Sequence, residues 1–250
     1  MENYFEPNQS HLTAFSIGEL LNDRSPLPED LIAPRILTPG GLLVFGGEPK
    51  VGKSDFLLTL LVHMAAGAPF LGMTPPRPLR IFYLQAELRY DYLRERLHHM
   101  VFDRSFLPLL RKNLCVTSNP KILLNTKGVE TLQKTISRHF SEDSIDIIVT
   151  DPLHYFFDGN EGEANKNSYS DMLSLLYQRL DQLRHMLNPE AGIILTHPLY
   201  KDHKRKNQDP FSTLRDTGDL RKYYTSAMIM FRPDKKATTR QLVFDLRNSI

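Results

Sequence analysis

A glycine-rich turn between two apolar runs is the feature that most constrains the fold of this chain. Residues 47–54 read GEPKVGKS and satisfy the pattern G-x-x-x-x-G-K-[ST] in full. An apolar run of strand length, residues 41–46, comes before the turn, and a run with helical spacing starts at Ser54. In this context glycines let successive backbone N–H groups converge on phosphate oxygens at a helix N-terminus. The stretch therefore predicts the phosphate-binding loop of a nucleotide-binding α/β domain.

Individual positions of this loop have expected roles. Lys53 would reach the β- and γ-phosphates of ATP, and the Ser54 hydroxyl would bind Mg²⁺. Lys50 adds a positive side chain at the mouth of the loop, where many such loops have glycine. An ordinary glycine turn explains the glycines but not the Lys-Ser pair at the required offset. The residues expected to contact the nucleotide are Gly47, Glu48, Pro49, Lys50, Val51, Gly52, Lys53, Ser54 and Asp55.

Strand-like and helix-like runs alternate along most of the chain. Strands are expected at residues 41–46, 80–85, 114–118, 145–151, 191–197, 226–232 and 240–247, and helices at 54–67, 90–102, 128–140 and 168–187. This alternation predicts an α/β fold with right-handed crossovers and a mainly parallel twisted sheet, covered by helices on both faces. The last two strands would extend the sheet as an antiparallel hairpin. Along residues 90–102, the pattern places Leu93, Leu97 and Val101 on one helix face.

The chain divides into two expected regions. Residues 1–39 are rich in proline and weakly patterned, and we expect an N-terminal arm or cover segment there. A short amphipathic piece lies within it at residues 14–23. Residues 40–250 carry the alternating pattern and are expected to form one ATPase core.

Composition excludes several classes of protein. A chain of 250 residues with 41% hydrophobic content can bury one full core. The single cysteine, Cys115, excludes an internal disulfide framework and fits a reducing compartment. A net charge of +2 gives no general attraction to nucleic acid, so any basic site must be local. No apolar stretch is long enough to cross a bilayer and no secretory signal is visible, so we expect a cytoplasmic protein without a membrane partner.

Two carboxylates follow predicted strands. Asp151 comes directly after residues 147–150 and is expected to hold the magnesium shell, although an Asp before proline also commonly starts a turn. Glu87 lies just past the strand at 80–85, which we expect to neighbour the phosphate loop. Ligands bind at the carboxyl ends of strands in open α/β sheets, so Glu87 is a candidate to orient and polarise the hydrolytic water. A glutamate that simply favours a helix N-terminus is the alternative, and the residues alone leave both open.

A strand-end histidine and a basic loop form a second candidate region. His197 ends a predicted strand and is a candidate to contact the γ-phosphate, with a structural role equally consistent. The loop that follows carries Lys201, Lys204, Arg205 and Lys206. Such a cluster binds nucleic-acid phosphates without regard to sequence, whereas a solvated surface loop is the usual explanation of a basic run. Its position behind His197 favours a DNA contact that depends on the nucleotide state.

Arg247 stands at the end of the last predicted strand. An arginine in this position could project across a subunit boundary and stabilise charge on a neighbour's γ-phosphate. An ordinary solvent-exposed arginine at a strand end is the alternative.

Taken in order, the motifs resemble those of RecA-like P-loop ATPases of the AAA_25 or RepA type, a group that includes hexameric plasmid replicative helicases and is related to the DnaB and RadA families. The resemblance extends from about Ile32 to Asn248. The motifs that carry it are GEPKVGKS, IFYLQAE, IIVTDPLHYF, NEGE, GIILTHPLYK, LRDTGDL and FDLRN.

The resemblance implies specific roles for the catalytic residues. Lys53 and Ser54 match the residues that bind phosphate and magnesium, and Asp151 matches the second acidic motif. Glu87 matches the catalytic glutamate. Arg247 matches the arginine that family members present across the subunit interface.

The resemblance is less complete near the DNA-facing loop. His197 and Lys201 match an element of the form HH-x-x-K, but Pro198 replaces its second histidine. Arg215 matches an arginine followed by glycine in the family, but Asp216 stands in the glycine position. The resemblance thus leaves the role of Arg215 open.

These inferences predict an Mg²⁺-dependent ATPase that assembles as a ring, expected to be a hexamer, and moves on or remodels DNA. Single-stranded DNA is the expected partner. ATP and Mg²⁺ are the expected ligands. A nucleotide-gated switch or assembly factor without helicase activity is the alternative, as is a module that binds nucleotide only to hold a partner.

Overall fold

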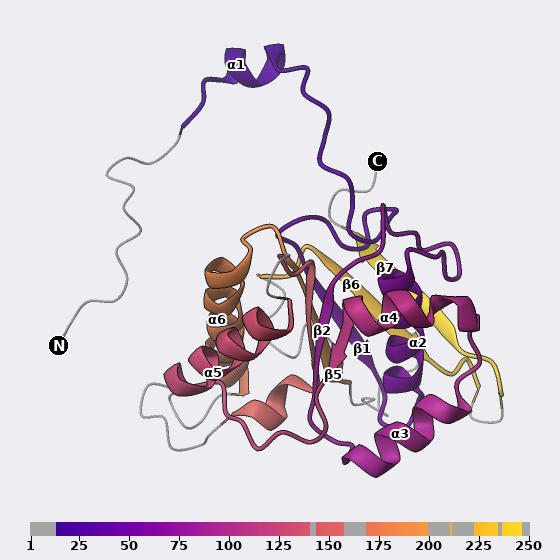
Figure 1. The fold of residues 1–250 in the computed structure, drawn as a ribbon. Coiled ribbons are helices and arrows are strands. Elements are labelled where there is room, and N and C mark those ends of the chain that lie inside the picture. The colour runs from indigo at the N-terminus through magenta and orange to yellow at the C-terminus, as the bar shows by residue number, and fades with distance from the viewer. Residues whose placement is uncertain are drawn as a thin grey trace.

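Seven strands form one sheet in the order β3-β2-β4-β5-β1-β6-β7 (Figure 1). The computed structural model describes residues 14–140, 144–157, 169–199, 211, 223–234 and 237–246. The strands are β1 Leu42–Gly47, β2 Ile81–Gln85, β3 Leu114–Val116, β4 Ile147–Asp151, β5 Gly192–Pro198, β6 Ser226–Phe231 and β7 Gln241–Leu246. Every neighbouring pair is parallel except β6 and β7, which are antiparallel. The predicted parallel sheet with a C-terminal antiparallel hairpin is confirmed.

Helices connect the strands and cover both faces of the sheet (Figure 1). They are α1 Ile17–Asn22, α2 Lys53–Ala66, α3 Tyr90–His99, α4 Leu107–Asn113, α5 Thr126–His139 and α6 Tyr169–Leu187, with short 3₁₀ turns η1 Arg104–Phe106 and η2 Leu153–Phe156. The predicted helices at 54–67, 128–140 and 168–187 correspond to α2, α5 and α6. Helix α4 was not predicted, because it has only 7 residues and a proline in its first turn.

Alternation along each strand divides the core into two hydrophobic clusters. Leu42 and Val44 of β1 face one side, where they join buried residues of α5 and α6. Leu43 and Phe45 face the other side, where they join buried residues of α2. This is the period of two that a strand buried on both faces requires. The apolar run in β1 is continuous because both of its faces lie in the core.

Helix α3 ends earlier than the sequence pattern predicted. Leu93 is buried and Leu97 packs against the core, as expected for one helix face. Val101 lies beyond the last residue of α3 and is 94% exposed, so its placement on that face was wrong. The backbone leaves the helix at Met100, which has an extended conformation, and the side chain that follows is no longer in register with the buried face.

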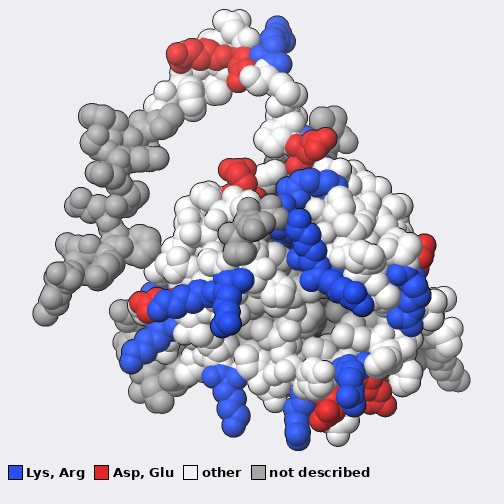
Figure 2. Space-filling model, in the orientation of Figure 1, with Lys and Arg blue, Asp and Glu red and all other residues white. Residues whose placement is uncertain are grey.

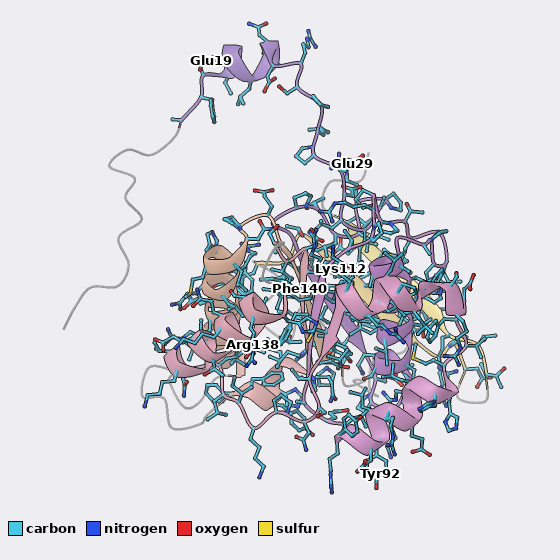
Figure 3. The ribbon with its side chains drawn as sticks, in the orientation of Figure 1. Glu19, Glu29, Tyr92, Lys112, Arg138 and Phe140 are labelled. Atoms are coloured by element: carbon cyan, nitrogen blue, oxygen red, sulfur yellow. The ribbon has the colours of Figure 1, made fainter. Side chains whose placement is uncertain are left out.

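Residues 14–29 are exposed, whereas later residues of the N-terminal segment join the core. Helix α1 has no buried residue and stands away from the sheet in Figure 1; Figure 3 labels Glu19 on it. Leu31, Ile32 and Leu37, by contrast, are buried in the same cluster as α2. The division at residue 39 stays a prediction. None of the helices in the described part of the chain could span a lipid bilayer.

Candidate nucleotide-binding site

The phosphate loop connects β1 to α2 with the geometry that the motif requires. Gly52 has a φ of 102° and caps the N-terminus of α2. Gly47 closes β1, where an added Cβ would lie 2.6 Å from the Met230 carbonyl oxygen, so no larger residue fits. Lys50 has a φ of 62°, a left-handed conformation that is unusual for a residue with a side chain. The loop is thus held in a backbone conformation that most sequences avoid.

Lys53 extends over the loop rather than into solvent. Its Nζ donates to the carbonyl oxygens of Gly47, at 2.8 Å, and of Glu48, at 3.0 Å. Burial lowers the pKa of Lys53, against the opposing charges of Asp151, Glu87 and Glu48. The ammonium group is therefore already beside the loop.

Asp151 is held by hydroxyl groups from both neighbouring strands. Tyr83 of β2 donates to its Oδ2 at 2.5 Å, and Thr196 of β5 donates to its Oδ1 at 2.5 Å. All three side chains are buried. Burial, together with the Asp151 charge, raises the pKa of Tyr83 well above its usual value, so the phenol stays a donor. The carboxylate is fixed in position before any ligand binds.

Glu87 shares a narrow cavity with the magnesium-site candidates Ser54 and Asp151. The cavity volume is about 10 Å³, close to the space that one water molecule needs. Partial burial and the charge of Asp151 raise the pKa of Glu87, whereas Lys53 and Arg96 lower it. The three predicted side chains therefore lie together at one edge of the sheet.

The strand that precedes Glu87, β2, does not lie beside the phosphate loop as the sequence analysis expected. We expected that strand to neighbour the phosphate loop, but β4 and β5 lie between β2 and β1. Glu87 is nevertheless close to the loop, because Ser54 on the first turn of α2 lines the same cavity. Glu87 is thus brought close to the site through α2, the helix that follows the loop, and not through pairing of β2 with β1.

The turn that carries Glu87 is fixed by Gln85. The Gln85 side chain accepts the Leu88 N–H at 2.8 Å and donates to the Leu88 carbonyl oxygen at 2.7 Å. It also donates to the Thr117 carbonyl oxygen at 2.8 Å. The backbone on which the catalytic candidate stands is thereby tied to the end of β3.

His197 lies on β5 directly beside the phosphate loop. It is in register with Gly46 of β1, and its side chain is buried. Burial lowers the pKa of His197 to about 4, with the positive charges of His154 and Lys53 adding to the effect. His197 is therefore neutral near pH 7. Its predicted contact with a γ-phosphate stays a prediction.

Several predicted site residues lie outside the described residues. They are Lys201, Lys204, Arg205 and Lys206 of the basic loop, Arg215, and Arg247. The predictions of DNA contact and of a contribution across a subunit boundary therefore remain predictions.

The described residues fit ATP and a magnesium ion. The loop has no room for a Cβ at Gly47 and continues into the N-terminus of a 14-residue helix, which suits a polyphosphate. The Ser54 hydroxyl and the Asp151 carboxylate supply oxygen ligands of the kind that Mg²⁺ prefers. In the described part of the chain, no cluster of three or more His, Cys, Asp or Glu side chains could hold a metal ion.

Sequence reasoning missed four residues around the site. Tyr83 and Thr196 are polar positions in buried strands, a signal that could have identified them as partners of a buried polar group. Arg96 of α3 lines the Glu87 cavity and pairs through Nε with Asp55 Oδ1 at 3.1 Å. Arg240 donates to the Val51 carbonyl oxygen in the phosphate loop. Nothing in the local sequence distinguishes the two arginines from surface residues.

The chain is similar to one protein-family model and, in its fold, to solved structures of an ATPase domain and a helicase. A family model, AAA_25, described as an AAA domain, matches residues 6–204. The ATPase domain of G40P has a similar structure, with a TM-score of 0.58 and 11% identity over 85% of this chain and 79% of that one. A DnaB-like replicative helicase, described with its interactions with primase, gives a TM-score of 0.64 and 10% identity over 93% of this chain and 62% of that one. Among curated protein sequences there is no match.

Proposed function

The chain belongs to the AAA_25 family of AAA domains, and on that premise we propose that this ATP-hydrolysing P-loop enzyme is a Mg²⁺-dependent, ring-forming DNA motor of the RepA type. The observation that supports hydrolysis is the convergence of Ser54, Glu87 and Asp151 on one cavity beside the phosphate loop. A nucleotide-binding module that does not hydrolyse ATP has no need of the Glu87 carboxylate in that position. The similarity in fold to a DnaB-like replicative helicase supports the part of the proposal that concerns DNA. We also propose a cytoplasmic location.

The proposed reaction is the transfer of the γ-phosphoryl group of ATP to water. Glu87 orients a water molecule and accepts its proton as the oxygen attacks the γ-phosphorus, and ADP leaves. Lys53 shifts from the loop carbonyls to the β- and γ-phosphate oxygens. Ser54 and Asp151 would hold Mg²⁺, which neutralises charge on those phosphates when bound. Arg247 of a neighbouring subunit would add positive charge at the γ-phosphate.

Two substitutions test the assignment of the chemistry. Glu87→Gln should retain nucleotide binding and lower the hydrolysis rate about 10²- to 10⁴-fold, because an amide cannot accept the proton. Lys53→Ala should abolish turnover. Glu130→Gln, an exposed glutamate on α5, is the matched control and should hydrolyse ATP normally. Hydrolysis by Glu87→Gln at the wild-type rate would show that the base is another residue.

A switch without motor activity is the second candidate function. A motor on DNA should hydrolyse ATP faster when single-stranded DNA is added, whereas a switch should be indifferent. The same samples should be measured for mass in solution with and without nucleotide, since a ring requires a closed oligomer. Unchanged ATPase rates with single-stranded DNA would favour the switch.

A further inference from the structure

The phosphate loop can point its N–H groups inward only if its carbonyl groups point outward and find donors there. The Gly47 oxygen accepts the Leu199 N–H at 3.0 Å as well as Lys53 Nζ. The Glu48 oxygen accepts the Val51 N–H at 3.3 Å. These donors come from the loop itself, from α2 and from the end of β5. The conformation of the cradle thus depends on where each carbonyl is satisfied.

The carbonyl of Val51 is the loop carbonyl that most needs a hydrogen-bond donor from elsewhere in the protein. It lies between Lys50 and Gly52, whose φ values of 62° and 102° are both left-handed. A left-handed conformation is unfavourable for a residue with a side chain, so the loop favours relaxation at Lys50 unless a contact opposes it. Val51 is only 3% exposed, and a buried carbonyl needs a donor from the protein.

Arg240 supplies that donor from the turn between β6 and β7. Its Nε donates to the Val51 oxygen at 2.7 Å, across 189 residues of sequence. Its Nη1 donates to the carbonyl oxygens of Thr238, at 2.8 Å, and Thr239, at 3.1 Å. The guanidinium is a planar fork with fixed donor directions, so the turn carbonyls orient the Nε–H toward the loop. Among the described side chains distant in sequence from the loop, Arg240 alone binds one of its carbonyls.

We propose that Arg240 is a positioning residue for ATP binding, which holds the Val51 carbonyl outward and keeps the phosphate loop in its nucleotide-binding conformation before the nucleotide arrives. The inference rests on the proposed function, because it takes the loop as the site of the ATP phosphates. It assigns the C-terminal hairpin a part in nucleotide affinity. A loop that must reorganise binds more weakly by the fraction of time that it spends in the competent conformation.

The test is nucleotide binding by Arg240→Gln, measured with a fluorescent ATP analogue and with ADP. We expect the affinity for both nucleotides to fall about tenfold, while the hydrolysis rate at saturating ATP stays within about twofold of wild type. Hydrogen exchange at residues 51–54 should be faster in the nucleotide-free variant and return to wild-type rates when nucleotide saturates the site. Arg240→Lys keeps the charge without the fork and should bind with intermediate affinity. Arg232→Gln, at the other side of the same hairpin turn, is the matched control and should bind as wild type does.

Each other outcome overturns the inference. Unchanged affinity and exchange would show that the Val51 contact is dispensable, and a loss of turnover at unchanged affinity would place Arg240 in the chemistry. If Arg240→Gln does not fold, the nucleotide affinity of Arg240→Lys tests the inference. If neither variant folds, the contact serves the stability of the fold, and the inference about nucleotide binding is wrong. Lys53→Ala separates this inference from the proposed function. If the wild type binds ATP and Lys53→Ala does not, a wild-type result for Arg240→Gln disproves only the inference about Arg240.

Discussion

At the scale of single residues, the most specific contacts of the site are the hydrogen bonds that the Tyr83 and Thr196 hydroxyl groups donate to Asp151. Each oxygen of the buried carboxylate accepts one hydrogen bond, from Tyr83 or from Thr196, and keeps a second lone pair for Mg²⁺ or for a water molecule bound to it. Hydrogen bonds to a charged group contribute about 1.5–3 kcal/mol, and a donor lost from a buried site leaves the charge uncompensated. The two hydroxyl groups therefore fix the position of the carboxylate and stabilise its charged form in the protein interior.

Tyr83→Phe and Thr196→Val should each weaken the use of Mg²⁺. Residues that orient a metal ligand typically change metal affinity about 10- to 100-fold, and we expect at least a tenfold rise in the Mg²⁺ concentration that half-saturates ATP hydrolysis. Each should also lower the free energy of unfolding by about 2 kcal/mol. Nucleotide binding without Mg²⁺ should stay unchanged. Tyr90→Phe, at an exposed tyrosine of α3, is the control, and equal Mg²⁺ dependence in all four proteins would contradict the prediction.

How much of the site the sequence could predict depends on the span of each contact. Lys53, Ser54, Glu87 and Asp151 were predicted because a loop motif or a strand end marks each one locally. The Tyr83–Asp151 bond spans 68 residues and the Arg240–Val51 bond spans 189. Such pairs depend on strand order and on the path of the hairpin, which periodicity does not contain. The residues that hold the site are therefore harder to predict than those that would perform the chemistry.

At the scale of elements, the same limit divides what was predicted from what was not. The strands and the long helices were predicted because each has an apolar period of its own. The order of strands was not predicted, so the strand that precedes Glu87 was expected beside the phosphate loop. Helix α4 and the end of α3 were missed or misplaced because short segments carry too few turns to show a period. Local pattern thus identifies elements, and packing decides how they are joined.

A buried carboxylate connects the amino ends of β2 and β4, the ends of these strands away from the site. Asp146, which precedes β4, accepts two hydrogen bonds from the Arg77 guanidinium, at 2.9 and 2.7 Å. It also accepts the backbone N–H of Arg80, at the start of β2, at 2.7 Å. Asp146 is only 3% exposed, so these donors replace solvent. The pairing of β2 with β4 is anchored from this end.

Asp146→Asn should lower the free energy of unfolding by about 2 kcal/mol, as measured by urea denaturation. An asparagine amide places N–H donors against the N–H donors of Arg77 and Arg80, and it removes the negative charge between them. Nucleotide affinity should not change, because the pair lies at the far ends of β2 and β4 from the phosphate loop. Asp91→Asn, exposed in the first turn of α3, is the control. A loss of nucleotide affinity equal to that of a site variant would show that the two ends of the sheet are coupled.

At the scale of the whole molecule, charge is unevenly distributed. The chain has a net charge of only +2, yet residues 111–140 carry six Lys or Arg and a single acidic residue, Glu130. Figure 2 shows Lys and Arg side chains spread over the face of the molecule that carries α4 and α5, and Figure 3 labels Lys112 and Arg138 on these helices. A nucleic acid could therefore be attracted to more than one surface. The proposal that DNA contacts the loop behind His197 must be tested against that second basic surface.

Two triple substitutions, each of which removes three positive charges, distinguish between the two candidate DNA-binding surfaces. Replacing Lys204, Arg205 and Lys206 by Gln should abolish stimulation of ATP hydrolysis by single-stranded DNA. It should also reduce the slope of log affinity against log salt by about 2, since each phosphate contact on a single strand contributes about 0.7. Replacing Lys121, Lys127 and Lys134, which are exposed on the α5 side, should leave stimulation intact. If both triples reduce DNA affinity equally, binding follows net charge and the loop has no special role. If only the α5-side triple does so, DNA contacts the surface around α5 and not the loop that we propose.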